Sequence, residues 1–85
     1  MTNPLITKRE KQENDDKVLL HIKGRLDMNA LEDFKNIFAD EFDTGNFKIV
    51  LNMSQVNFIV STHLGVIMSN YKKAQSAGGD IKFSS

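Results

Sequence analysis

Residues 17–24 alternate between apolar and polar side chains. Their apolar face carries Val18, Leu20 and Ile22. A period of two residues is typical of a half-buried β-strand. The preceding residues 5–12 alternate more loosely and carry several charges, which is typical of a strand at the edge of a sheet. The polar run 13–16 between the two segments predicts a turn, so the sequence predicts a β-hairpin.

The spacing of apolar residues changes after residue 27. They now recur every three or four positions, at Leu31, Phe34, Ile37, Phe38 and Phe42. This spacing predicts an amphipathic helix of about four turns. Its N-terminus can be capped by Asp27, or by Asn29 paired with Glu32 in a capping box. The run Thr44-Gly45-Asn46 is expected to end the helix in a left-handed turn.

A second strand and a second helix follow. Residues 47–53 contain a continuous apolar run, which is typical of a strand in the centre of a sheet. Ser54 and Gln55 predict a polar turn, and a shorter apolar stretch then leads to Ser61. The spacing predicts a second helix there, with an inner face formed by Leu64, Ile67, Met68, Tyr71 and Ala74. The run Ala77-Gly78-Gly79 is expected to end it.

Residues 80–83 predict a fourth strand, which gives the order β-β-α-β-α-β. Because each helix then joins two strands, we expect right-handed crossovers and a mixed sheet of the α/β class with both helices on one face. The chain continues for only two residues beyond Phe83. We therefore expect residues 1–85 to form a single domain that lacks a C-terminal helical segment.

Composition and charge exclude several classes of function. Eleven basic residues balance eleven acidic ones, so the formal net charge is zero and gives no basic surface for nucleic acid. No apolar run approaches the roughly 20 residues that cross a bilayer, and the polar N-terminus carries no secretory signal. The absence of cysteine excludes disulfides and thiolate metal sites. We expect a small cytoplasmic domain without membrane insertion.

Residues suited to catalysis or metal binding are few. His21 and His63 are isolated in the sequence, and no spacing of metal ligands surrounds them. Ser61 and His63 lie two residues apart at a helix start, so their side chains point in different directions and do not form a catalytic dyad. Gly78 and Gly79 follow a helix rather than open one, which indicates a helix end instead of a phosphate-binding loop. We expect no enzyme activity, cofactor or metal.

The start of the second helix is the most informative position. An apolar segment ends there at Ser61 and Thr62, and one of their hydroxyls is expected to cap the helix, a contribution of about 0.5–2 kcal/mol. The functional alternative is phosphorylation. A phosphoryl group would add about −1.5 to −2 charges next to the amides and the positive end of the helix dipole. It would change the charge of that surface without unfolding the domain.

Several stretches of the chain follow a known family pattern: Gly24-Arg25-Leu26-Asp27, Leu31 with Phe34, the block from Ile49 to Val66, and Gly78-Gly79. Through them the chain, from Pro4 to Phe83, resembles the STAS family, named after sulfate transporters and anti-sigma factor antagonists. The block is similar to the family's strand followed by S-x-V-x-F-I and then Asp-Ser-Ser-Gly-Leu-Gly. In the antagonists the first serine of that pattern is phosphorylated by an anti-sigma kinase, and Ser61 corresponds to it.

Three residues depart from that pattern. Val60 stands where the family has aspartate, Thr62 where it has the second serine, and His63 where it has the first glycine. Loss of the aspartate removes a charge from the expected partner surface, and His63 adds bulk at the helix entry. The hydroxyls of Ser61 and Thr62 are kept. The resemblance therefore still implies the fold, while it implies phosphorylation less strongly.

The resemblance implies a bacterial, cytoplasmic protein-interaction module of transcription regulation, which binds an anti-sigma factor or serine kinase. Ser61 is the implied phosphorylation site and Thr62 the alternative, and a phosphoryl group would repel the partner. The kinase would bring ATP, for which this chain shows no site. The implied partner-binding residues are Asp27, Val60, Ser61, Thr62, His63, Leu64 and Val66.

A second interpretation is a domain that is not phosphorylated and serves as a scaffold or regulatory subunit of a stress-signalling complex or a membrane transport ATPase. Val60 and His63 favour it, because they alter the residues that a kinase would meet. The family also continues beyond the fourth strand with helical structure, so we expect open apolar surface on the sheet and the second helix. Such a surface favours a homodimer or a strand-exchanged oligomer.

Overall fold

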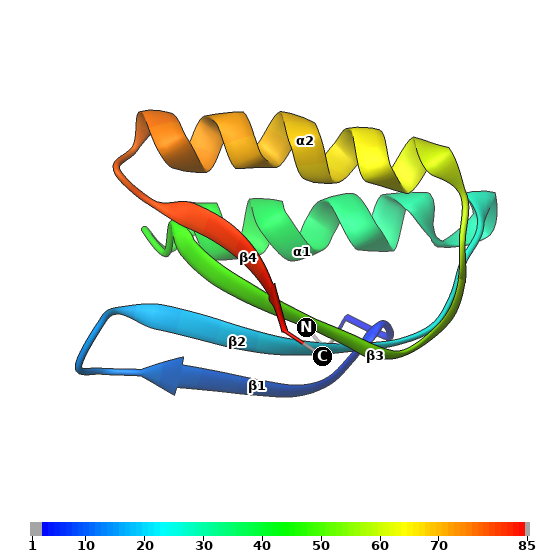
Figure 1. Cartoon of the computed structure of the whole chain (residues 1–85), viewed down its shortest axis with the longest axis horizontal. Helices are drawn as coiled ribbons and strands as arrows, with labels where there is room; N and C mark the ends of the chain where they lie inside the picture. Colours follow the sequence, from blue (N-terminus) through cyan, green and yellow to red (C-terminus); the bar gives the residue numbers. More distant parts are fainter. Residues whose placement is uncertain (1–2, 85) are drawn as a thin grey trace.

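The computed structural model of the chain describes residues 3–84. In this part of the chain four strands form one sheet in the order β1-β2-β3-β4, and both helices cover the same face (Figure 1). The mixed α/β architecture and the order of strands and helices predicted from the sequence are confirmed. The elements are β1 (Ile6–Gln12), β2 (Lys17–Leu26), the short 3₁₀ helix η1 (Met28–Ala30), α1 (Leu31–Asp43), β3 (Lys48–Ile59), α2 (Ser61–Ser76) and β4 (Asp80–Ser84).

The sheet combines an antiparallel hairpin with two parallel strand pairs. β1 and β2 are antiparallel, whereas β2 and β3, and β3 and β4, are parallel. Parallel neighbours need a crossover connection, which α1 and α2 supply. β3 is paired on both sides, as its continuous apolar run predicts. The C-terminal ends of β2 and β3 lie side by side at one end of the sheet, where Leu26 pairs with Ile59.

The core lies between the sheet and the two helices. The predicted apolar face of the second strand is confirmed, because Val18, Leu20 and Ile22 are fully buried. They share one cluster with Phe34 and Phe38 of α1, whose rings meet edge to face with centroids 5.4 Å apart. The same cluster includes Leu5, Leu26, Ile37, Ile49, Leu51, Ile67, Ala74 and Ile81.

The polar turn predicted at Ser54 and Gln55 is wrong, because β3 continues through these residues to Ile59. Between the pairs His21–Asn52 and Lys23–Gln55, β3 advances one residue more than β2, which is a β-bulge. Within the bulge, the Oδ1 atom of Asn52 accepts the backbone N–H of Ser54 at 3.0 Å. The bulge and this local hydrogen bond let polar residues stay within the strand.

The inner face of α2 differs from the sequence prediction. Ile67 and Ala74 are buried as predicted, and His63 joins them at 0% exposure. Three residues that the spacing places on the inner face are exposed instead: Leu64, Met68 and Tyr71. Apolar residues occupy two adjacent flanks of this helix, so their spacing alone does not decide which flank packs on the sheet. The observed rotation leaves an apolar stripe in contact with solvent.

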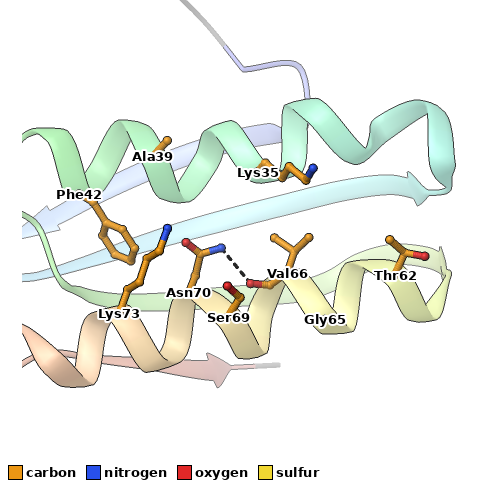
Figure 2. Close-up of a pocket in the computed structure, with 9 residues that line it drawn as sticks. All are labelled: Lys35, Ala39, Phe42, Thr62, Gly65, Val66, Ser69, Asn70 and Lys73. Carbon is orange, nitrogen blue, oxygen red and sulfur yellow. Dashed lines mark hydrogen bonds between the residues drawn. The ribbon is translucent and has the colours of Figure 1, made fainter.

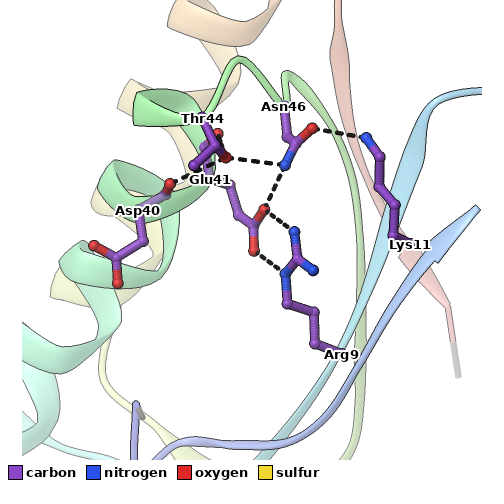
Figure 3. Close-up of polar contacts among 6 residues, drawn as sticks. All are labelled: Arg9, Lys11, Asp40, Glu41, Thr44 and Asn46. Atoms are coloured by element: carbon purple, nitrogen blue, oxygen red, sulfur yellow. Dashed lines mark hydrogen bonds and ion pairs between the residues drawn. The ribbon is translucent and has the colours of Figure 1, made fainter. Parts of the chain in front are cut away.

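An ion pair ties the edge strand β1 to the end of α1. The Arg9 guanidinium donates to both carboxylate oxygens of Glu41, from Nε at 2.7 Å and from Nη2 at 3.0 Å (Figure 3). The Asn46 side chain donates to the same carboxylate at 3.0 Å and accepts from Lys11 Nζ at 2.7 Å. Burial raises the pKa of the Glu41 carboxyl, but the hydrogen bonds from Arg9 and Asn46 outweigh it and hold this pKa below its ordinary value.

Candidate protein-interaction site

The candidate site lies where β2 and β3 end and α2 begins, at the right-hand end of the molecule in Figure 1. The Val60 N–H donates to the carbonyl of Leu26 at 3.0 Å, which joins the two strand ends. Parallel strands direct their carboxyl ends to the same edge of a sheet. The loop after β2, with Asp27, therefore lies at the same end as Ser61.

Ser61 is exposed and is the first residue of α2. The half-buried Val60 before it is the N-cap, with φ −90° and ψ 152°, and its side chain makes no capping hydrogen bond. The expectation that Ser61 or Thr62 caps the helix is therefore wrong, because the cap falls one residue earlier. The first turn of α2 also contains no acidic residue. The positive end of the helix dipole thus stays uncompensated at Ser61.

We expect the Val60→Asp variant to be more stable than Val60→Ala by about 1 kcal/mol. The backbone of Val60 already has the extended conformation of an N-cap, and a carboxylate there can accept N–H groups of the first turn. Both substitutions remove the same isopropyl group, so their difference isolates the cap. Urea denaturation at pH 7 measures it. Equal stability of the two variants would show that no capping group is missing.

Thr62 and Val66 face a different part of the surface from Ser61. Both line an open groove between the two helices (Figure 2). Thr62 is exposed at its end and Val66 is half-buried along its floor. From α1 the groove is lined by Lys35, Ala39 and Phe42. A phosphoryl group on Thr62 would therefore enter this groove, whereas one on Ser61 would lie outside it.

His63 is buried beneath the candidate site. Its side chain is fully buried, with the ring centroid 4.8 Å from that of Phe34. Its Nε2 atom donates to the backbone carbonyl of Asp27 at 2.7 Å, and its Nδ1 atom is buried without a hydrogen-bond partner among the described residues. His63 therefore fixes the loop after β2 against the start of α2, and the structure places its side chain away from the surface that a partner would touch.

The half-buried Asp27 caps η1, which precedes α1, whereas the N-cap of α1 itself is Ala30, without a side-chain hydrogen bond. The predicted side-chain cap therefore lies on the short 3₁₀ helix and not on α1. The Oδ1 atom of Asp27 accepts the backbone N–H groups of Asn29 and Ala30 at 3.1 and 3.2 Å. Its other carboxylate oxygen lies 3.9 Å from Nε of Arg25. Arg25 in turn stacks on the ring of Phe58, 4.2 Å from its centroid. These contacts hold the exposed Arg25 guanidinium between the Asp27 carboxylate and the Phe58 ring.

Exposed apolar side chains lie at this end, and of these the sequence analysis identified Leu64 but not Met28 or Ile59. Met28 of η1 is 57% exposed, and Ile59 of β3 and Leu64 of α2 are also exposed. The sequence signal was available, because each stands next to a predicted loop or helix start, where burial is incomplete. Together with the Ser61 hydroxyl they form a mixed patch. We call it the Ser61 surface, and its residues are Met28, Ile59, Ser61 and Leu64.

The other histidine of the chain, His21, lies within β2. His21 is hydrogen-bonded to Glu10 at 3.0 Å and to Asn52 at 3.2 Å, as expected for a structural histidine in a strand. No group of three or more potential metal ligands lies together in this part of the chain. None of the helices described between residues 3 and 84 is long and apolar enough to span a membrane. The Ser61 surface is thus the strongest candidate site.

Comparison with known protein families matches residues 8–85 to the STAS domain. The chain therefore belongs to the STAS domain family, as its sequence motifs imply. The protein TM1081 from Thermotoga maritima, a candidate anti-sigma factor antagonist with a known crystal structure, has a sequence 29% identical to that of this chain. It superposes with a TM-score of 0.79 over 95% of this chain and 68% of that protein.

Two more distant structures share the fold. The anti-sigma factor antagonist SpoIIAA, in its unphosphorylated form, is 18% identical with a TM-score of 0.71 over 89% of this chain and 69% of SpoIIAA. A domain of the protein Mglu is 23% identical with a TM-score of 0.76 over 98% of this chain. The chain spans only 20% of the length of Mglu and 62% of TM1081 as solved by NMR.

Proposed function

We propose that this STAS domain is a bacterial protein-interaction module of the anti-sigma factor antagonist type, and that phosphorylation of Ser61 controls its docking to an anti-sigma factor or serine kinase. The observation that carries the proposal is an exposed serine at an uncapped helix start, with exposed apolar side chains around it. Family membership supports it, as does the fold shared with SpoIIAA, which has been solved in both unphosphorylated and phosphorylated forms. In this role the domain acts in the cytoplasm, on transcription, by binding rather than catalysis.

The switch works through charge at an interface. A partner that covers the Ser61 surface removes Met28, Ile59 and Leu64 from water, which favours binding. A phosphoryl group on Ser61 adds about −1.5 to −2 charges in the middle of these side chains, and burying that charge is costly. The free amides of the α2 start can accept the charge without unfolding the domain. Phosphorylation would therefore release the partner and leave the fold intact.

A second candidate function is a constitutive scaffold within a stress-signalling complex or a membrane transport ATPase. Two observations favour it. Val60 replaces the acidic residue of the family pattern. The buried His63 also fixes the two loops of the Ser61 surface whether or not Ser61 is modified. A scaffold would hold its partner through the apolar residues alone.

Protein capture from host lysate separates the two functions. The baits are the wild-type domain, Ser61→Ala and Ser61→Asp, and the bound proteins are identified by mass spectrometry. Thr62→Asp is the matched control, because it places the same charge one residue away in the groove between the helices. We expect Ser61→Asp to recover an ATP-binding serine kinase at least about tenfold less than the other three baits, a difference of about 1.4 kcal/mol in binding.

Phosphoryl transfer gives an independent readout of the same site. Adding ATP and Mg²⁺ to the captured complex should phosphorylate the wild-type domain and leave Ser61→Ala unmodified. Equal recovery of other assembly subunits by all four baits would contradict the switch and support the scaffold. Transfer to Thr62 instead of Ser61 would place the switch in the groove between the helices.

A further inference from the structure

The groove between α1 and α2 carries a positive charge at each end. It encloses about 500 Å³, and two of its lining residues are lysines, Lys35 of α1 and Lys73 of α2 (Figure 2). None of the described lining residues is acidic. The acidic residues of α1 lie outside this lining, and Asp40 and Glu41 line a separate hollow beside Arg9. The groove therefore favours a negatively charged occupant, although α1 as a whole is rich in carboxylates.

Neither lysine has a strong ion pair within residues 3–84. Lys73 is exposed and forms no ion pair in this part of the chain. Lys35 lies 3.6 Å from Glu32, one turn earlier on α1, with side chains that are 50% and 81% exposed. An exposed pair of this kind contributes little to stability. An anionic group in the groove can therefore replace Glu32 beside Lys35.

The two ammonium groups belong to opposite ends of an apolar floor. Phe42 follows Lys35 by seven residues on α1, which is about 10 Å along a helix. The Lys73 side chain extends toward α1 beside Phe42 (Figure 2). Between the two ends the floor is formed by Ala39, Phe42 and Val66. A ligand that contacts both lysines thus needs two negative groups on the order of 10 Å apart, joined by an apolar middle.

Gly65 keeps the middle of the groove open. It lies inside α2, where glycine is less stabilising than alanine. A Cβ atom at Gly65 would meet no atom of the described chain within 4 Å, so packing within residues 3–84 does not require glycine there. Such a glycine lets another molecule approach the helix backbone closely. Thr62 and Ser69 line the groove before and after Gly65, and their hydroxyls can donate to ligand oxygen atoms.

The groove lies away from β4. Gln75, on the opposite flank of α2, donates to Asp80 of β4 at 3.3 Å. A helix that joined β4 to a further parallel strand would lie on this β4 side of α2, because such crossovers are right-handed. The lining of the groove is thus set by α1 and α2 themselves.

We propose that the groove binds an elongated small molecule with an anionic group at each end and an apolar middle. The anionic ends contact Lys35 and Lys73, and the middle packs on Phe42 and Val66 across Gly65. The volume of the groove lies within the range of about 300–1,000 Å³ that small-molecule sites occupy. The site is distinct from the Ser61 surface, so it adds a ligand to the proposed interaction module.

NMR titration of the ¹⁵N-labelled chain with decanedioate tests the site. This probe holds two carboxylates on an apolar chain of about the required length. We expect the amide signals of Gly65, Ser69 and Lys73 to shift, with a dissociation constant on the order of 1 mM, because both ion pairs are exposed. Butanedioate is too short to span the groove, and decanoate has only one carboxylate. Each should bind at these residues about threefold more weakly or less tightly still.

Neighbouring residues supply matched controls. Lys73→Ser should weaken the binding of decanedioate about threefold, whereas Lys72→Ser should not, because Lys72 is equally exposed but does not line the groove. Gly65→Leu should abolish binding by filling the groove, and circular dichroism verifies that this variant is folded. Thr62→Asp should weaken binding and Ser61→Asp should not, since only Thr62 lines the groove. The last comparison separates this inference from the proposed switch.

Several results would overturn the proposal. Decanedioate that shifts none of the groove amides up to about 10 mM would exclude the site. Equal binding of decanoate or butanedioate would contradict a ligand with two anionic ends, and equal weakening by Lys72→Ser would reduce the effect to net charge. Tighter binding of an alanine-based helical peptide with two glutamates about 10 Å apart would assign the groove to a protein partner instead.

Discussion

The Gly79→Ala variant is expected to lose about 3 kcal/mol of stability or more. A Cβ atom at Gly79 would overlap the carbonyl oxygen of Phe47 and reach 2.5 Å from its carbonyl carbon. Because these are backbone atoms, no side-chain rotation relieves the clash. The same carbonyl accepts the Asp80 N–H at 2.9 Å, at the point where β4 joins β3. Moving Phe47 would therefore disturb the start of a strand pair.

Two other glycines are matched controls for this effect. A Cβ at Gly78 meets no atom within 4 Å, but the residue has φ +81°, so Gly78→Ala should cost only about 1 kcal/mol of backbone strain. Gly65 also has open space and lies within α2, so Gly65→Ala should stabilise the domain by about 0.5–1 kcal/mol. Urea denaturation ranks the three variants. A Gly79→Ala cost no greater than that of Gly78→Ala would refute the close backbone approach.

Replacing Arg9 with alanine is expected to cost about 2–3 kcal/mol at pH 7. The substitution leaves the carboxylate of Glu41, whose side chain is only 7% exposed, without its main cationic partner. The cost is below that of a fully buried pair because the Arg9 side chain is 44% exposed. Lys8→Ala on the same strand is the control, since its ion pair with Glu10 at 3.5 Å is largely exposed and should contribute little.

The same pair gives a pH dependence with a defined sign. The pKa of Glu41 is lower in the folded domain than its ordinary value, so the folded state favours the carboxylate. The Glu41 carboxylate stabilises the folded domain at pH values above about 4.3, the pKa of glutamate in the unfolded chain. This stabilisation is lost as the pH falls through the lower pKa that Glu41 has in the folded domain. The difference between wild type and Arg9→Ala should therefore shrink below about pH 4. A constant difference from pH 7 to pH 3 would contradict the role assigned to Glu41.

Local sequence patterns predicted the order of elements well because each depends on short-range physics. Alternation places Val18, Leu20 and Ile22 on a buried strand face, and the spacing of Phe34 and Phe38 marks the buried side of α1. Both helix ends fall at the predicted glycine-containing turns. The bulge in β3 could not be foreseen, because the pairing register with β2 decides whether Ser54 stays in the strand.

The candidate site was predicted in part. The motif gave the position of Ser61 at the start of α2, and the chain topology explains why Asp27 lies at the same end. His63 stands among the partner-binding residues implied by the family pattern, yet the structure buries its side chain on Phe34. The direction of the His63 side chain depends on how α2 is rotated about its axis against the sheet. Met28 became part of the site only once the folded surface was known.

The sequence by itself determined the order of the strands and helices, the C-terminal ends of the helices, the family and the serine at the helix start. These features depend on residue periodicity, turn chemistry and motif spacing, which act between near neighbours. Only the tertiary structure decided that Glu41 is buried against Arg9, that Val60 is the helix cap, and that one apolar flank of α2 stays exposed. Each of these depends on a contact, or on its absence, between segments far apart in the chain, and no local pattern encodes it.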